Sequence, residues 1–426
     1  MNALLRSARS LLLLCLLATA CGAPRATSSA GSDLPGRPDA AGVAAARADL
    51  DRYLKRLEAI HPEPFHGIDR GVFVAELDEL KAALPTLSRE QAMVELMRAT
   101  ALLSRAGRDG HQIALPLPED GGMLLPMRAF EFADGLFVTA SHPSAEPLVG
   151  ARVTALNGHP IEEVLDALEP LVPRDSPATV ANFRPVFMSR VDVLRGLGLL
   201  GAAATVPLTV EEDGAERTVS LEPITFDAYR DWSGDLGVFR LPSADDDPTF
   251  SVEELAASHT LYIRYSQVQR IPVEDLAAIR ERAAAPDIER VVLDLRQNPG
   301  GDNHSYPPLL AALQAEGVDV PGRLYVLTDH TTFSAAANLA SELERTTDAV
   351  FAGDPMGGGI NFWDDVSFVR LDAWPIPMQV GVSTRYWQMG LPDDPRLTIE
   401  PDLAVPLTAA DYFAGRDAVL EAVLAQ

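Results

Sequence analysis

The stretch R-V-V-L-D-L-R-Q-N-P-G-G, residues 290–301, decides the fold of this 426-residue chain. Its first half is an apolar run that predicts a buried strand, and its second half is a turn that ends in two glycines. From Leu261 onward, similar short runs alternate with helical patterns. Strands are expected at 261–265, 290–296, 324–328, near 349–352, 366–371 and 377–383, and helices at 273–284, 305–315 and 333–345. This alternation predicts an α/β core with a mostly parallel sheet.

Two segments follow predicted strands at their carboxyl ends, where α/β folds place their chemistry. In the first, Gly300 and Gly301 would let backbone N–H groups face a ligand, as an oxyanion hole requires. In the second, T-T-F-S-A-A-A-N over residues 331–338, Ser334 stands at a strand-to-helix junction like a nucleophile elbow. Taken singly, the glycine pair is a structural turn and Ser334 a helix cap, so neither motif establishes chemistry by itself.

Three motifs in this order closely resemble the serine peptidases of the C-terminal processing and tricorn core protease family. They are D-L-R-Q-N-P-G-G at 294–301, V-L-T-D-H-T-T-F-S-A-A at 326–336 and G-D-P-M-G-G-G at 353–359. The resemblance is strong from Leu261 to the end of the chain and looser before it. It implies a ClpP/crotonase-like core, peptide or protein substrates, and neither cofactor nor metal. It also implies that Ser334 is the nucleophile, and that the amides of Gly300 or Gly301 and of Ala335 form the oxyanion hole.

The composition restricts the choice of catalytic base. Only Lys55 and Lys81 are lysines, and both lie on predicted N-terminal helices. The C-terminal processing members of the family use a Ser/Lys dyad with the lysine in a G-K-G motif, but the corresponding stretch here, residues 354–361, contains no lysine. Arginine does not replace lysine as a base because its guanidinium keeps its proton near neutral pH. The resemblance therefore favours the tricorn-like branch, which uses serine, histidine and an acid.

His111 lies in R-D-G-H, which resembles the D-G-H motif of that branch. It is therefore the implied general base for Ser334, although a single histidine at a domain junction is by itself more simply structural. The acid that orients it is expected at Asp393 or Asp394 rather than at Glu400. His304, in D-N-H, has no partner at metal-ligand spacing, and no metal site is expected.

The N-terminus is typical of an exported lipoprotein. Arg6 and Arg9 precede an apolar run, Leu11 to Leu17, that is too short to span a bilayer and indicates a signal peptide over residues 1–20. The sequence L-A-T-A-C ending at Cys21 resembles a bacterial lipobox, which predicts acylation of Cys21. The expected location is the bacterial cell envelope, facing the periplasm and held by a lipid anchor, with the outer membrane favoured. The alternative is an ordinary signal cut after an A-x-A site.

The rest of the chain divides by texture. Residues 21–40 are rich in Ala, Ser, Gly and Pro and predict a flexible tether. Helical patterns at 41–60, 70–83 and 88–106 predict a helical domain over residues 41–107. Residues 108–225 resemble a PDZ domain, with strands at 112–117, 129–132, 136–140, 151–156, 204–212 and 216–221, a helix at 161–170 and an insertion at about 172–203. Residues 226–426 form the predicted peptidase core.

Charge and cysteine content exclude other classes of protein. A formal charge of −26 without a basic stripe argues against nucleic-acid binding. Two cysteines, both near the start, exclude a disulfide framework. Two rival functions stay open: a catalytically inactive relative that binds peptide termini, and a crotonase-like enzyme acting on acyl-CoA, which export disfavours. Oligomeric state and cleavage preference are not determined by the sequence.

Overall fold

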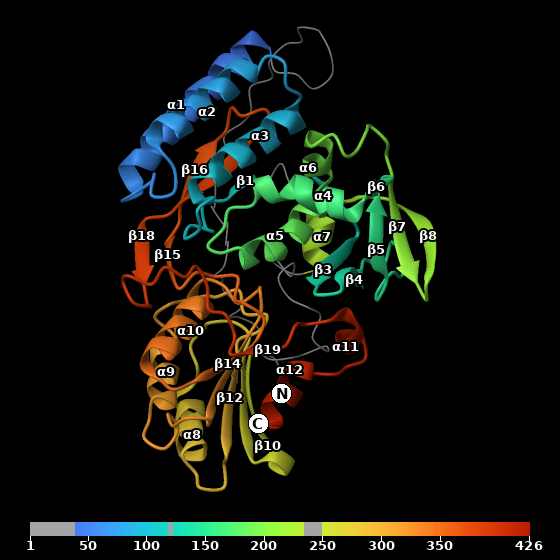
Figure 1. The fold of residues 1–426 in the computed structure, drawn as a ribbon. Helices are drawn as coiled ribbons and strands as arrows, with labels where there is room; N and C mark the ends of the chain where they lie inside the picture. The colour runs from blue at the N-terminus through green and yellow to red at the C-terminus, as the bar shows by residue number, and fades with distance from the viewer. Residues whose placement is uncertain (1–38, 118–121, 234–248) are drawn as a thin grey trace, which may run out of the picture.

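The computed structural model describes residues 39–117, 122–233 and 249–426. The predicted signal peptide, Cys21 and most of the tether therefore lie outside the described residues. The described chain is mixed α/β and has three parts, which Figure 1 shows in blue, in green, and in yellow to red. These are a layer of helices, an antiparallel β unit, and a larger sheet covered by helices.

The helical layer follows the sequence pattern closely. It consists of α1 (Ala40–Ile60), α2 (Arg70–Ala83) and α3 (Arg89–Ala101). Each helix begins after a side chain that caps its free N–H groups, and Ser88 forms a capping box with Gln91 at the start of α3. Helix α1 ends at Ile60, and its C-cap His61 lies directly before Pro62, as expected.

The antiparallel unit contains a sheet in the order β3-β4-β5-β7-β8. Its strands are β3 (Met127–Phe132), β4 (Gly135–Ser141), β5 (Arg152–Leu156), β7 (Val206–Glu212) and β8 (Ala215–Leu221), and the helix α4 (Ile161–Leu168) follows β5. The predicted insertion folds as α5 (Ala178–Met188) and α6 (Val191–Gly196). Helix α5 packs against the edge strand β3.

The larger sheet has the order β10-β11-β12-β13-β14-β19. Its strands are β10 (Phe250–Leu255), β11 (Thr260–Tyr265), β12 (Arg290–Asp294), β13 (Leu324–Thr328), β14 (Val350–Gly353) and β19 (Leu403–Ala404). All neighbouring pairs from β11 onward are parallel, and only β10 is antiparallel, which confirms the expected mostly parallel sheet.

Helices cover both faces of this sheet. Helices α8 (Val273–Ala283), α9 (Pro307–Leu313) and α10 (Ala335–Thr346) contribute to one apolar cluster with the strands. The C-terminal helix α12 (Ala418–Leu424) packs on the other face through Val419 and Val423. Burying both faces explains why β12 and β13 read as continuous apolar runs.

Two late strands leave this sheet. The expected strands at 366–371 and 377–383 form as β16 (Ser367–Leu371) and β17 (Met378–Val382). These two strands pair with each other, and β17 pairs with β1 (Ala114–Pro116) rather than with a core strand. Their buried side chains join the apolar cluster of the helical layer. Figure 1 shows β16, in red-orange, beside the blue helices. The chain reaches β16 through β15 (Asn361–Asp364) and leaves β17 through β18 (Arg385–Gln388). These two flanking strands pair antiparallel with each other.

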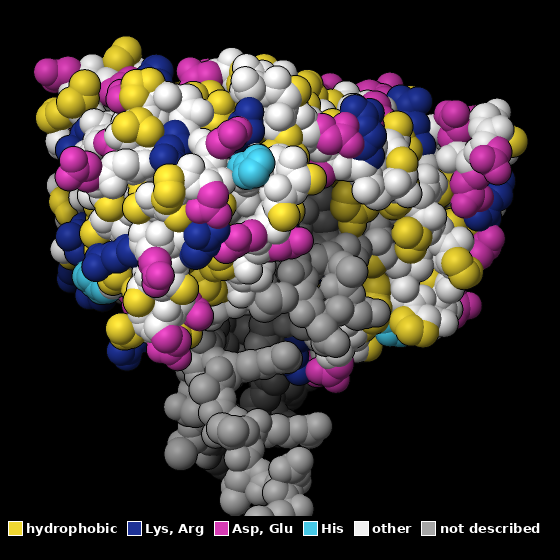
Figure 2. Space-filling view, turned by 90° about the horizontal axis from the view of Figure 1, so that it is seen from below, with side chains coloured by type: hydrophobic (Ala, Val, Ile, Leu, Met, Phe, Trp, Pro, Cys, Tyr) yellow, Lys and Arg dark blue, Asp and Glu magenta, His cyan; other side chains and the backbone are white. Residues whose placement is uncertain are grey.

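The surface carries both signs of charge. On the face seen in Figure 2, acidic and basic side chains are interspersed over the described residues. Within the described ranges, no helix combines the length and apolar character that crossing a membrane requires.

Candidate active site

Ser334 lies at the junction between β13 and α10 that the sequence predicted. Its backbone has φ 52° and ψ −126°, a left-handed region that costs a non-glycine residue free energy and is common at functional sites. The side chain does not cap α10, so its hydroxyl is available for chemistry. The geometry matches a nucleophile elbow rather than the helix cap that was the simpler interpretation.

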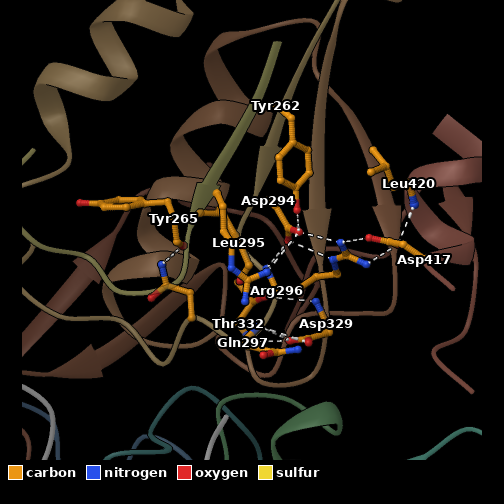
Figure 3. Close-up of polar contacts among 12 residues, drawn as sticks. Tyr262, Tyr265, Asp294, Leu295, Arg296, Gln297, Asp329, Thr332, Asp417 and Leu420 are labelled. Atoms are coloured by element: carbon orange, nitrogen blue, oxygen red, sulfur yellow. Dashed lines mark hydrogen bonds and ion pairs between the residues drawn. The ribbon is translucent and has the colours of Figure 1, made fainter. Parts of the chain in front are cut away.

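The loop before Ser334 is fixed by buried Asp329. One carboxylate oxygen of Asp329 accepts hydrogen bonds from the backbone N–H groups of Thr331 and Thr332, and the carboxylate also accepts from the N–H of Gln297. The hydroxyl of Thr332 donates to the carbonyl of Leu295. Asp329 thereby joins the loop after β13 to the loop after β12, as Figure 3 shows.

The loop after β12 is held from its other side by an ion network around buried Asp294. Arg296 forms ion pairs with Asp294 at 2.6 Å and with Asp417 at 2.7 Å, and Asp417 caps helix α12. Tyr262 donates its hydroxyl proton to Asp294. Figure 3 shows this network beside the Asp329 contacts. Because the charges are paired and hydrogen-bonded, they fix the position of the glycine turn that follows.

The glycine turn supplies one free amide rather than two. The side chain of buried Asn298 accepts a hydrogen bond from Gly300 N at 2.9 Å and donates to the carbonyl of Tyr265 at 2.6 Å. The amide of Gly300 is therefore occupied. Among the described residues, Gly301 N and Ala335 N have no hydrogen-bond acceptor. Of the two predicted glycines, Gly301 is thus the better candidate for an oxyanion hole with Ala335.

Ser334 opens into a pocket of about 320 Å³ between the three parts of the molecule. The wall is mainly apolar and aromatic, with contributions from the core loops, from β15 and from helix α5 of the insertion. The residues that line it include Ile113, Phe183, Gly301, Phe333, Val366, Phe368 and Trp387. His111, Asp364 and His304 also line it. A serine in a largely apolar cavity with free amides nearby is suited to nucleophilic attack on a carbonyl.

His111 also lines this pocket, but no hydrogen bond joins its ring to Ser334. Ser334 Oγ donates a hydrogen bond of 3.1 Å to Asp364 Oδ2, and His111 Nε2 lies 3.5 Å from Asp364 Oδ1. The imidazole stacks on the rings of Phe333 and Phe362. Asp364 therefore stands between the predicted nucleophile and the predicted base.

The acids expected beside His111 are not brought to it. Asp394 forms an ion pair of 2.6 Å with Arg396, and its backbone carbonyl accepts from Arg108. The hydrogen bond from Arg396 lowers the pKa of Asp394. Asp393 is exposed, and neither residue lines the pocket. The carboxylate of Asp394 is therefore paired with an arginine two residues along the chain and is not directed at His111.

Sequence analysis did not identify Asp364 because the residue lies in no recognised motif. Its signal is weak: two adjacent acids, Asp364 and Asp365, end an otherwise apolar segment. In the structure the side chain of Asp364 is nearly buried at the end of β15. Burial raises its pKa, while the charge of His111 opposes the rise.

A second buried acid, Asp175, holds the turn before His111. Asp175 Oδ1 accepts a hydrogen bond of 2.5 Å from Gly110 N, and the Asp175 carbonyl accepts from Arg108 N. The residue comes from the insertion, directly before α5. Burial raises the pKa of Asp175 to about 7.

One cluster has the composition of a metal site. The ligand atoms of His61, His66 and Asp109 lie within 4.8 Å of one another. However, His61 Nδ1 accepts the backbone N–H of Glu63, so the proton of a neutral ring is on Nε2, where it donates to Asp109 at 3.0 Å. A ring in this tautomer has no lone pair directed at the centre of the cluster. The arrangement is that of a buried hydrogen-bonded pair.

Comparison with known proteins places the fold. No family model and no curated protein matches the chain. The solved structure of mature CPAF complexed with lactacystin is 14% identical, with a TM-score of 0.62, and the match covers 90% of this chain and 97% of that one. A second structure of mature CPAF is 14% identical with a TM-score of 0.56 and coverage of 87% and 94%. The photosystem II D1 C-terminal processing protease is 15% identical over 84% and 93% of the chains, but its TM-score is 0.39.

The chain therefore has the fold of mature CPAF over nearly its whole described length. This similarity agrees in fold with the resemblance noted in the sequence.

Proposed function

We propose that this chain is a serine-type peptidase, with Ser334 as nucleophile. The observation that supports the proposal is the hydroxyl of Ser334, held at a strained elbow in a pocket and hydrogen-bonded to buried Asp364. Next to it lie an imidazole and two amides without acceptors in the described structure. The similarity of the fold to CPAF, and the motifs shared with the C-terminal processing and tricorn family, support the same reaction class.

In the proposed reaction, Ser334 Oγ attacks the carbonyl carbon of a peptide bond. The pair formed by Asp364 and His111 takes up the hydroxyl proton and later returns it to the leaving amine. The oxyanion that forms accepts hydrogen bonds from Gly301 N and Ala335 N. A water molecule then hydrolyses the acyl-enzyme by the reverse use of the same groups. No cofactor enters this scheme.

The architecture proposed for the molecule follows the resemblance. The sheet with α8, α9 and α10 would be a ClpP/crotonase-like core, and the unit from β3 to β8 a PDZ-like domain. The order of strands and the Asn157-Gly158 turn before α4 support the second assignment. Acylation of Cys21 and a location at the envelope, facing the periplasm, are proposed on the sequence alone.

The test is reaction of the full chain with a fluorophosphonate probe. We expect the wild type to be labelled and Ser334→Ala to be unlabelled, because the probe bonds only to an activated hydroxyl. The matched control is Ser341→Ala, which removes another buried serine of α10 and should be labelled at the wild-type rate. Equal labelling of Ser334→Ala and wild type would overturn the assignment.

The binding-only alternative is supported by the same geometry, since no hydrogen bond joins the ring of His111 to Ser334. It predicts a folded wild type that binds peptides and is not labelled by the probe. The same experiment therefore separates the two functions.

A further inference from the structure

The sequence predicts that the acid positioning His111 lies near the C-terminus. The structure has a different buried acid, Asp175, in the insertion and next to the turn before His111. Asp175 lies in the segment that PDZ-like domains lack, between α4 and α5. It is fully buried, and its backbone is bonded to the segment that carries the histidine. Arg108 N donates to the carbonyl of Asp175, and Asp109 N donates to that of Arg174.

Only one of the two carboxylate oxygens of Asp175 accepts a hydrogen bond. Oδ1 accepts the N–H of Gly110, the residue directly before His111, at 2.5 Å. Oδ2 is buried and has no hydrogen-bond partner among the described residues. A buried carboxylate oxygen without a donor is costly, so its persistence at this position calls for a partner.

The imidazole ring of His111 also lacks hydrogen-bond partners. Both of its ring nitrogens are buried without a hydrogen bond in the described structure. Nε2 lies nearer to Asp364, at 3.5 Å, which leaves Nδ1 as the nitrogen that needs an acceptor. The imidazole is close enough to act electrostatically on Asp175, because its charge is the largest influence that lowers the pKa of that carboxyl against burial. Asp109 and Asp364 act in the opposite direction.

We propose that Asp175 is the positioning residue of the site, whose Oδ2 accepts the Nδ1–H of His111 and so holds the ring with Nε2 toward Asp364 and Ser334. The inference rests on the proposed function for its consequence in catalysis. Asp175 does not touch the reacting atoms and acts only through His111. It fixes the tautomer whose Nε2 can take up a proton, and it stabilises the imidazolium that results.

The substitution Asp175→Asn gives an unusual test because Gly110 N–H still requires an oxygen. The amide oxygen therefore takes the place of Oδ1, and the amide NH₂ takes the place of Oδ2. A donor then faces His111 Nδ1, and the ring proton moves to Nε2, where it blocks proton uptake. A purely structural role predicts that Asn is milder than Ala, since it preserves shape and one hydrogen bond. The proposal predicts that Asn is at least as harmful as Ala.

The experiment combines two readouts on the full chain. The ¹⁵N shifts of the His111 ring, assigned by comparison with His111→Gln, should show a proton on Nδ1 in the wild type and on Nε2 in Asp175→Asn. The rate of fluorophosphonate labelling should fall by about 10²- to 10⁴-fold in the same variant. The melting temperature should be no lower than that of the wild type, because the substitution removes a buried charge.

Thr179→Val is the control for loosening the segment. Thr179 Oγ1 accepts from the backbone N–H groups of Asp175 and Ser176 and donates to the carbonyl of Gly357. Its loss should lower stability without changing the tautomer of His111. An unchanged His111 tautomer in Asp175→Asn overturns the proposal, whether or not labelling occurs. A shifted tautomer with no labelling of the wild type upholds the proposal and instead counts against the peptidase function.

Discussion

At the scale of single residues, the site depends on contacts between distant parts of the chain. Ser334 and Asp364 are 30 residues apart and meet only because β15 returns past the start of α10. His111 comes from the junction after the helical layer, and Asp175 from the insertion. The strained elbow and the glycine turn depend on the local sequence. Which acids belong to the site depends on their burial and on whether an arginine pairs with them.

Asp364 gives a prediction for pH dependence. Burial raises the pKa of Asp364 above the usual 3.8, and the carboxylate must be ionised to accept the proton of Ser334. The labelling rate of the wild type should therefore fall as the pH drops through this raised pKa, at a higher pH than an exposed carboxyl would give. Asp364→Asn should lower the rate by about 10²- to 10⁴-fold, because an amide cannot take up the proton.

Stability separates this effect from unfolding. Because the folded-state pKa of Asp364 is raised, its charge opposes folding above the unfolded-state pKa, so Asp364→Asn should not lower the melting temperature at neutral pH. The matched control is Asp372→Asn, an exposed acid outside the pocket, which should be labelled at the wild-type rate. Near-normal labelling of Asp364→Asn would remove Asp364 from the reaction.

At the scale of elements, two segments cross between parts of the molecule. Helix α5 carries Phe183 into the pocket, and Ser176 and Thr179 before and within it donate to the backbone carbonyl of Gly357. In the opposite direction, β16 and β17 leave the core as a pair, and β17 pairs with β1. The insertion is thus a wall of the site, and the late strands belong to the core of the helical layer.

Because β16 and β17 pack on the helical layer, we expect the C-terminal part of the chain to be unstable without that layer. In residues 226–426 alone, β16 and β17 lose β1 and α1, which uncovers Val369, Leu371, Trp374, Met378, Val380 and Val382. At about 1.5–3 kcal/mol each, this is on the order of 10 kcal/mol, comparable with the stability of a whole domain. The fragment should therefore lack near-ultraviolet circular dichroism and a cooperative thermal transition.

Co-expression with residues 39–225 is the control for this fragment. It should restore a cooperative transition, because it returns β1 and the helices to the exposed strands. If the fragment unfolds cooperatively without its partner, the packing of β16 and β17 contributes much less than their burial indicates.

At the scale of the whole molecule, acidic residues outnumber basic ones and the formal charge is −26. On the face seen in Figure 2, acidic side chains lie among basic ones rather than in a single patch. In the proposed arrangement, attachment to a membrane depends on the acylated Cys21.

The anchor can be tested by the two cysteines. In a bacterial host, Cys21→Ser should abolish incorporation of a palmitate analogue and move the protein from the membrane fraction to the soluble periplasmic fraction. Cys15→Ser, within the apolar run of the signal, should leave both unchanged. Incorporation that survives in Cys21→Ser would show that acylation does not occur there.

Local sequence determined the strands of the core, the helices of the N-terminal layer, the elbow at Ser334 and the glycine turn. These features depend on periodicity, capping and backbone freedom within a few residues. The D-G-H motif indicated His111 as a site residue, and His111 lines the pocket. Which glycine amide is free was decided only by the tertiary structure, because the side chain of Asn298 occupies that of Gly300.

Tertiary structure also decided the acids. The sequence indicated Asp393 or Asp394, yet Arg396 pairs with Asp394. Strand pairing brings Asp364 to His111, and the insertion brings Asp175 to Gly110, the residue before His111. Carboxylates look alike in a sequence. Their roles depend on which of them is buried, and on which donors reach them, and both are properties of the packed chain.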